Sequence, residues 1–235
     1  MCVTGLVTIV PATQFTLTGK VILLILIQLG GLGIIACTMG AFLILRKQIT
    51  IRSRVMIQDS YDLHSMTGIV VLLRYVLRGT FFVEGCGAVL YAVRFIPQYG
   101  LLRGLWYAVF HAISAFCNAG IDLLGVRGAY SSLTSYAYDP LINLVIILLI
   151  VIGGIGFLTW DDIYRNRHHI SRYRMQSKVI LSYSLALIFI PAILFFFLEF
   201  QDIPAGKRIL VSLFQSVTTR TAGFNTADLS SMRES

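Results

Sequence analysis

Charged residues are scarce in this sequence. Only 13% of its 235 residues are Asp, Glu, Lys or Arg, whereas about a quarter of the residues in a soluble domain are charged. Hydrophobic residues make up 57% of the chain, and its mean hydropathy is +0.80. This composition excludes an ordinary soluble protein and indicates an integral membrane protein in contact with a lipid bilayer.

Acidic residues are fewer than basic ones. The chain has 11 Asp and Glu against 19 Lys and Arg, a formal net charge of +8. The basic residues are concentrated at residues 46–54 and 165–178, between apolar runs. This pattern favours membrane topology over nucleic-acid binding, because cytoplasmic loops are enriched in Lys and Arg. We expect a multi-pass plasma membrane protein with both basic loops in the cytoplasm and no nucleic-acid partner.

Four apolar runs are long enough to cross a bilayer core, which needs about 20 helical residues. They lie at residues 20–45, 67–96, 140–160 and 179–200. Two further segments, residues 101–116 and 206–218, are shorter, and each ends in a glycine turn. The pattern predicts an all-α integral membrane protein in which short pore helices enter the membrane between spans.

Three turns share one pattern: two small or polar residues, a glycine and then a large apolar residue. They lie at residues 3–6, 118–121 and 221–224, at the span ends opposite to the basic stretches, and therefore on the outer side. Glycine allows the positive φ that aims successive carbonyls at one axis, and a ring of carbonyls can replace the hydration shell of a cation. Any one such turn could instead be an ordinary helix C-cap.

We predict that these turns form an ion filter. Its residues are Thr4, Gly5, Asn118, Ala119, Gly120, Thr221, Ala222 and Gly223. The side chains of Thr4, Asn118, Thr221 and Asn225 are expected to hydrogen-bond the loops from behind.

The chain also contains an internal repeat. IQLGGLGI at residues 27–34 corresponds to IVIGGIGF at residues 150–157. The repeating unit is a span, a short pore helix, a glycine turn and a second span. We expect residues 1–46 to end repeat one, 47–66 and 161–178 to be cytoplasmic linkers, 67–160 to form a complete repeat two and 179–235 to begin repeat three. The alternative for the glycine clusters is close helix packing.

Other polar groups favour structural roles. We expect Glu84, in mid-span, to hydrogen-bond a neighbouring helix, although intramembrane carboxylates are also functional candidates. His111 is expected to be an interior hydrogen-bonding residue and Asp122 a loop cap that could also attract cations. His168 and His169 lack metal-binding partners, and Asp161 and Asp162 are expected to be solvated. The four cysteines, which lack CxxC spacing, are expected to be buried thiols: Cys2, Cys37, Cys86 and Cys117.

One further pattern points away from transport. Residues 31–36 fit the dinucleotide fingerprint GxGxxA. That motif requires a strand in a soluble βαβ unit, whereas these residues lie in an apolar run of 26 residues. We therefore expect no nucleotide here and no cofactor bound covalently to the chain.

Several segments together resemble a known family. They are VTGL (3–6), IQLGGLG (27–33), FHAISAFCNAGID (110–122), SLTSYAYDPLINLVIILLIVIGGIGF (132–157) and LFQSVTTRTAGFNT (213–226). In combination they are similar to the Ktr/Trk (KtrB/TrkH-like) potassium uptake subunits, of which this chain resembles an incomplete copy. The resemblance implies four non-identical repeats around a pseudo-fourfold axis, with Gly5, Gly120 and Gly223 as filter glycines of repeats one to three.

The resemblance also carries expectations about function. It implies K⁺ as the transported ion, with Na⁺ coupling possible in the family. It implies a cytoplasmic ring of nucleotide-binding regulatory subunits (KtrA/TrkA-like) as partner and a homodimer of the membrane subunit. The sequence thus predicts K⁺ transport through a carbonyl-lined pore and no enzymatic activity. The alternatives are a non-conducting truncated fragment with a structural or assembly role, or a membrane-embedded enzyme, which would need more polar groups near Glu84.

Overall fold

The structure is a computed structural model that describes residues 10–33, 69–124, 132–167, 169–199 and 203–226. Its regular elements in these ranges are all helices. They are α1 (Pro11–Gln14), α2 (Leu17–Leu32), α5 (Ile69–Tyr99), α6 (Leu101–Phe116), η1 (Thr134–Tyr136), α7 (Pro140–Gly154), α8 (Phe157–Asn166), η2 (Ile170–Arg172), α9 (Met175–Leu198) and α10 (Ala205–Thr221). The prediction of an all-α protein is confirmed for the part of the chain that is described.

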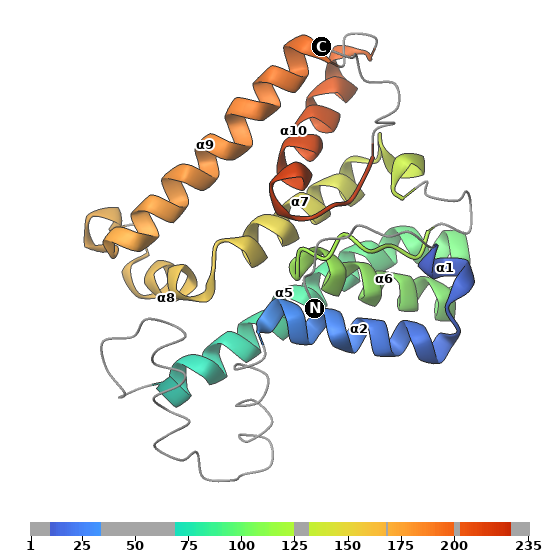
Figure 1. Ribbon diagram of the computed structural model, residues 1–235, viewed down its shortest axis with the longest axis horizontal. Coiled ribbons are helices and arrows are strands. Elements are labelled where there is room, and N and C mark those ends of the chain that lie inside the picture. Colours follow the sequence, from blue (N-terminus) through green and yellow to red (C-terminus); the bar gives the residue numbers. More distant parts are fainter. Residues whose placement is uncertain (1–9, 34–68, 125–131, 168, 200–202, 227–235) are drawn as a thin grey trace.

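Two helix hairpins build the molecule. The short helix α6 packs along the long helix α5, and α10 packs along α9 in the same manner (Figure 1). Helix α7 contacts α5 and both short helices, and α2 lies against α6. Gly104 permits the close approach within the first hairpin, since a Cβ added there would lie 2.7 Å from the Cα of Ile96. The short helices therefore sit inside the bundle, close to α7.

The predicted short helices agree closely with α6 and α10, and the fourth expected span agrees with α9. Within the described residues, two helices are long and apolar enough to cross a membrane, Arg74–Tyr99 in α5 and Met175–Leu198. Helices α7 and α8 together make a third if they count as one broken span. Helix α5 continues through Pro97 to Tyr99, three residues beyond the end expected for the span at residues 67–96.

The third expected span, residues 140–160, is not one continuous helix in the structure. Helix α7 ends at Gly154, and α8 leaves it at an angle of 94°. Gly156 adopts φ +83° and ψ 150°, which lies outside the helical region and is accessible to glycine. Gly33, at the equivalent place in the repeat, ends α2 with φ +83° and ψ 142°. The same backbone conformation therefore breaks both glycine-rich helices; residues 34–45 of the first expected span lie outside the described part.

The expectation that Asp161 and Asp162 are solvated is also wrong. Both are buried, because the bend turns α8 against the start of α9. Asp161 forms an ion pair of 2.7 Å with Arg165, one turn along α8. Asp162 accepts hydrogen bonds from the backbone N–H of Arg174 and the hydroxyl of Ser177. These contacts join α8 to α9 across the connection between them.

Candidate functional site

Two of the three predicted filter loops touch each other. One follows α6 and contains Asn118, Ala119 and Gly120, and the other follows α10 and contains Thr221, Ala222 and Gly223. A Cβ added at Gly120 would lie 1.8 Å from the carbonyl oxygen of Ala222. The structure therefore brings together six of the eight predicted filter residues. Thr4 and Gly5 lie outside the described residues.

Both loops have the backbone conformation that the glycine pattern predicts. Gly120 has φ +66° and Gly223 has φ +75°, and Asn118 also has a positive φ of 55°. L-residues with a bulky side chain rarely adopt this region. Each loop follows directly on the C-terminus of a short helix, where unpaired carbonyls and the helix dipole place partial negative charge. The junction of the loops is thus electrostatically suited to a cation.

Hydroxyl groups of the short helices hold these loops. The Ser114 hydroxyl donates to the carbonyl of Ile121 at 2.6 Å and accepts from the Ile121 N–H at 3.1 Å. The Thr218 hydroxyl donates to the carbonyl of Phe224 at 2.7 Å. Ile121 and Phe224 are the residues that directly follow the two glycines. Neither hydroxyl is among the residues predicted from the sequence, although their place in the last turns of the short helices was a usable signal.

The side chain of Asn118 was predicted to hydrogen-bond the loop from behind, and this prediction is wrong for its side-chain carbonyl oxygen. Its side-chain oxygen is buried and accepts no hydrogen bond. Asn225 holds the third loop through its backbone: its N–H donates to the Ser132 hydroxyl at 3.2 Å, and its carbonyl accepts from Leu133 N–H at 2.9 Å. The segment before η1 is thereby joined to the loop after α10.

Two polar residues beside the first of these loops have the expected structural roles. His111 is buried within α6, with Nδ1 2.7 Å from the carbonyl of Tyr107 and Nε2 accepting from Leu123 N–H at 3.4 Å. The carbonyl can only accept, so Nδ1 carries the proton. Asp122 accepts from Leu124 N–H at 3.0 Å and caps the turn. The loop after Gly120 is therefore ordered by side chains on both sides.

Glu84 has the predicted hydrogen bond to a neighbouring helix. Its two carboxylate oxygens accept from the Gln28 amide of α2 at 3.0 and 3.2 Å. The Gln28 carbonyl oxygen in turn lies 3.9 Å from the Cys117 sulfur, directly before the filter loop. Cys117 is buried as expected, whereas Cys86 is exposed. A polar chain thus runs from α5 through α2 to the end of α6.

The two glycine clusters, at residues 30–33 and 153–156, make similar contacts. A Cβ at Gly31 would lie 2.3 Å from the Cys117 sulfur. At the equivalent Gly154, the nearest atom would be Nη2 of Arg220 at 3.4 Å. Cys117 and Arg220 each lie three residues before a loop glycine. In both cases, the end of a short helix therefore packs on the glycine-rich helix that precedes it in the chain.

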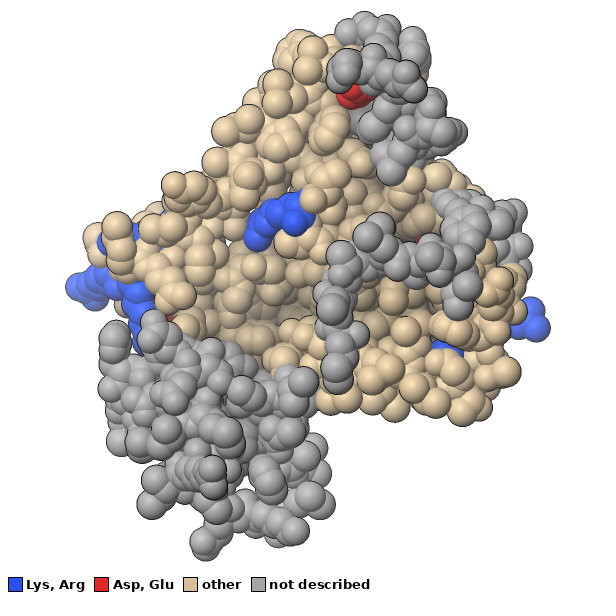
Figure 2. Space-filling model, in the orientation of Figure 1, with Lys and Arg blue, Asp and Glu red and all other residues tan. Residues whose placement is uncertain are grey.

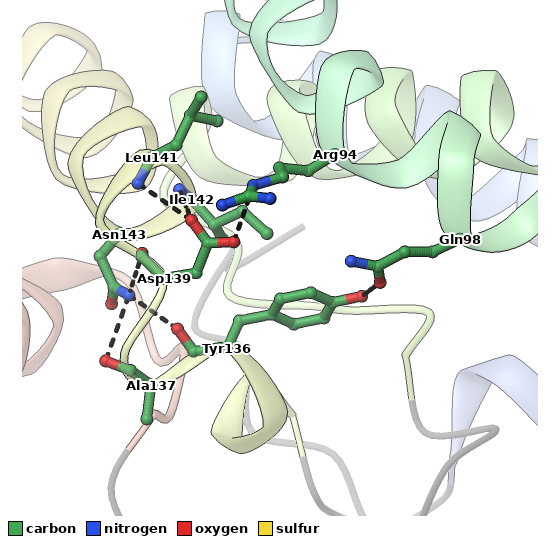
Figure 3. Close-up of polar contacts among 8 residues, drawn as sticks. All are labelled: Arg94, Gln98, Tyr136, Ala137, Asp139, Leu141, Ile142 and Asn143. Carbon is green, nitrogen blue, oxygen red and sulfur yellow. Dashed lines mark hydrogen bonds and ion pairs between the residues drawn. The ribbon is translucent and has the colours of Figure 1, made fainter.

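A polar clamp holds α5, α7 and the loop before α7 in place (Figure 3). Asp139 accepts from the N–H groups of Leu141 and Ile142 at the start of α7 and forms an ion pair of 3.0 Å with Arg94 of α5. The Asn143 amide donates to three carbonyls in the preceding turn, at 2.7–3.3 Å. The Tyr136 hydroxyl donates to Gln98 at the end of α5. This clamp fixes α7, on which the ends of α6 and α10 rest.

No group of three or more His, Cys, Asp or Glu side chains is arranged for a metal ion in the described part of the chain. His169 is exposed there, and His168 lies outside it. Besides backbone carbonyls, the region of the two loops carries the side chains of Asn118 and Arg220, which both lie against Gly154.

The chain is similar in sequence to a family of cation transport proteins and to bacterial potassium uptake proteins. The model of the TrkH family, described as a cation transport protein, matches residues 1–235. The chain is 35% identical over 233 residues to the potassium/sodium uptake protein NtpJ of Enterococcus hirae, which covers 97% of this chain and 50% of that protein. It is 36% identical over 238 residues to the Ktr system potassium uptake protein B of Bacillus subtilis, covering 99% of this chain and 52% of that protein.

A more distant similarity extends to fungi. The chain is 29% identical over 161 residues to the low-affinity potassium transport protein of Saccharomyces cerevisiae, covering 55% of this chain and 17% of that protein. The chain spans about half the length of the bacterial relatives named above.

Proposed function

Because the chain belongs to the TrkH family of cation transport proteins, we propose that it conducts K⁺ through a pore lined by backbone carbonyls, as part of a Ktr/Trk-type uptake system. The bacterial relatives are potassium uptake proteins and not enzymes. The filter in this proposal consists of the loops around Gly5, Gly120 and Gly223. The observation that carries it is the direct contact between Gly120 and the carbonyl of Ala222.

The physical case rests on the cost of bare backbone in a membrane. Non-helical backbone at membrane depth is tolerated where it is buried in protein or lines a wet cavity. The two described loops are non-helical, meet each other and follow the negative ends of short helices. Their carbonyls can replace the water that K⁺ loses on entering a filter. A cation pathway accounts for all three features together.

The proposal places the loops in repeats around a pseudo-fourfold axis. Repeat two comprises residues 67–160, residues 1–46 end repeat one and residues 179–235 begin repeat three, with linkers at 47–66 and 161–178. Two observations support this arrangement. Gly33 and Gly156 share one backbone conformation, and Gly31 and Gly154 receive the ends of successive short helices. Neighbouring units thus repeat one packing contact.

The orientation of the chain in the membrane is proposed from the positions of its basic residues, and its partners are proposed from its family. We place the filter loops outside and the basic stretches 46–54 and 165–178 in the cytoplasm, in the plasma membrane. There a nucleotide-binding regulatory ring (KtrA/TrkA-like) would dock, and two membrane subunits would pair. Na⁺ remains a second candidate ion, because one relative is named a potassium/sodium uptake protein.

Rubidium uptake tests the function. The chain alone, and a version completed with the segments of a relative that it does not span, are expressed in a host that lacks K⁺ uptake. We expect uptake from the completed version. Uptake there but not from the chain alone would assign the chain the alternative role, that of a non-conducting fragment with a structural or assembly role. No uptake from either, with both present in the membrane, would overturn the proposal.

Gly120→Ser tests the filter itself. The substitution puts a Cβ at a positive φ and 1.8 Å from the Ala222 oxygen, so both loops must shift. We expect the preference for K⁺ over Na⁺ to fall at least tenfold, a change of about 1.4 kcal/mol in relative barrier heights. The control is Gly206→Ser at the start of α10, where the added atom meets nothing within 4 Å. Equal selectivity in the two variants of the completed version would remove Gly120 from the filter.

A further inference from the structure

An apolar crevice lies in the bend between α7 and α8. Its volume is about 300 Å³, and its walls come from three helices. They include Tyr75 and Val83 of α5, Ile152 and Ile155 around the end of α7, and Trp160 and Tyr164 of α8. Figure 1 shows α8 turning away from α7 at the same end of the molecule at which α5 begins. The crevice exists because the helix breaks here, since a straight continuation of α7 would not close over α5.

The aromatic wall of the crevice is specifically fitted. Gly79 of α5 makes room for Trp160, because a Cβ there would lie 3.0 Å from the indole ring. The Trp160 N–H donates to the carbonyl of Ile152 at 2.9 Å, which holds the ring in the bend. The rings of Tyr75 and Tyr164 lie 5.3 Å apart across the opening. Tyr and Trp are enriched at membrane interfaces, where one end of the side chain is apolar and the other is hydrated.

Two arginines flank the crevice on α5. Arg74 and Arg78 are one turn apart, on one side of the helix stripe that carries Tyr75 and Val83. Both are exposed, and among the residues that the structure describes neither has an acidic partner. Arg165 of α8 differs, since Asp161 already neutralises it. Figure 2 shows that basic side chains gather at this end of the molecule, where α8 lies.

This combination matches one class of ligand. An anionic phospholipid has acyl chains for the apolar crevice and a phosphate for the guanidinium groups. The crevice adjoins the part of α5 that is apolar enough to cross a membrane, so its neighbour at that depth is lipid and not a soluble protein. Unpaired arginines near a bilayer surface are stabilised when they reach anionic headgroups.

We propose that the crevice between α5, α7 and α8 is a binding site for an anionic phospholipid of the cytoplasmic leaflet, with an acyl chain against Trp160 and the phosphate on Arg74 and Arg78. The choice of leaflet rests on the orientation given under the proposed function. Bound lipid would brace the bend between α7 and α8. Because α7 carries the contacts to both filter loops, the site would link the composition of the bilayer to the pore.

Native mass spectrometry of the purified chain tests the site. Detergent-solubilised protein is titrated with phosphatidylglycerol and, separately, with phosphatidylcholine of the same acyl chains. We expect phosphatidylglycerol to bind about 25-fold more tightly, since each of the two arginines near an anionic headgroup contributes about a fivefold effect. Equal binding of the two lipids by the unmodified chain would overturn the proposal.

Substitutions distinguish recognition of the lipid headgroup from binding of the acyl chain. In R74Q/R78Q the preference for phosphatidylglycerol should be lost, whereas R74K/R78K should keep most of it. The matched control is Arg103→Gln, an exposed arginine of α6 outside the crevice. Val83→Trp fills the crevice and should weaken both lipids. Preserved preference in folded R74Q/R78Q, or unchanged binding in Val83→Trp, would contradict the site.

Two further experiments test the alternative ligands, a free phosphate and a soluble protein. Soluble glycerol 3-phosphate at millimolar concentration should not displace the lipid; displacement would indicate a free-phosphate site instead. Pull-down of a relative's regulatory subunit should be equal for R74Q/R78Q and the unmodified chain, and its loss would indicate a protein-docking surface instead. Lipid binding is measured without ion flux, so a negative result here is distinct from a failure of rubidium uptake.

Discussion

Single hydroxyl groups determine how the filter loops are held. Ser114 and Thr218 lie in the last turns of α6 and α10 and bond the residue after each loop glycine. Ser114 is fully buried, and it serves both the N–H and the carbonyl of Ile121. A buried polar group that loses its partner destabilises a protein by about 1–3 kcal/mol. These two residues are therefore as relevant to the geometry of the two loops as the glycines.

Ser114→Ala should loosen the loop after α6 without removing its carbonyls. We expect a lower unfolding temperature, by the equivalent of about 1–3 kcal/mol, and a reduced K⁺ over Na⁺ preference in the completed version. Ser182→Ala in α9 is the control, because its hydroxyl is exposed and donates only to Val179 of its own helix. If the two variants behave alike in thermal unfolding and flux, Ser114 does not position the loop.

At the scale of elements, the two ends of α7 are set by different features. It begins at the Asp139 cap and the Arg94 ion pair, and it ends at the glycines that turn α8 through 94°. The cap and the ion pair use different oxygens of one carboxylate. Their contributions can therefore be separated by substitution.

Asp139→Asn should keep the cap and lose the ion pair, whereas Asp139→Ala should lose both. Asn and Asp are equally good N-caps, and replacement by Ala costs about 1 kcal/mol. The ion pair is worth less than about 1 kcal/mol, because Arg94 is half exposed. We expect unfolding temperatures in the order wild type, Asp139→Asn, Asp139→Ala, with Arg94→Gln close to Asp139→Asn. Equal values for the two Asp139 variants would show that the cap does not stabilise α7.

At the scale of the whole molecule, two similar glycine-rich sequences, at residues 27–34 and 150–157, meet dissimilar side chains. Gly31 meets the small Cys117, which is joined to Gln28, and Gly154 meets the long Arg220. Val151 stands where Gln28 stands in the first copy, and it offers no acceptor to Arg220. The two glycines thus occupy corresponding places in similar sequences, while the chemistry at each contact differs.

The glycine contacts predict unequal effects at equivalent positions. Gly31→Ala forces its Cβ to within 2.4 Å of the Cβ of Cys117, and overpacking of this kind costs about 1–3 kcal/mol. Gly154→Ala meets only the ends of two side chains, Nη2 of Arg220 at 3.4 Å and Nδ2 of Asn118 at 3.5 Å. We expect Gly31→Ala to lower the unfolding temperature in detergent and Gly154→Ala to leave it nearly unchanged. Equal effects would mean that the two contacts do not differ in packing.

The sequence by itself determined the class of the protein, the short helices and the glycine turns. These features are local: apolar runs of a given length form helices in lipid, and Gly120 and Gly223 permit positive φ wherever the chain places them. The family resemblance also followed from contiguous motifs. The boundaries of α6, α9 and α10 were close to those predicted, because the composition changes sharply at the ends of these helices.

Only the tertiary structure decided which segments meet. The contact of Gly120 with Ala222 joins residues more than a hundred positions apart, and no local pattern specifies it. The bend after Gly154 buried Asp161 and Asp162, which polarity alone would place in water; Asp162 finds its partners at the start of α9, and Asp161 pairs with Arg165 of α8. The roles of Ser114 and Thr218 became visible only when their distances to the loops were known. Burial and partnership depend on how helices pack, which composition does not encode.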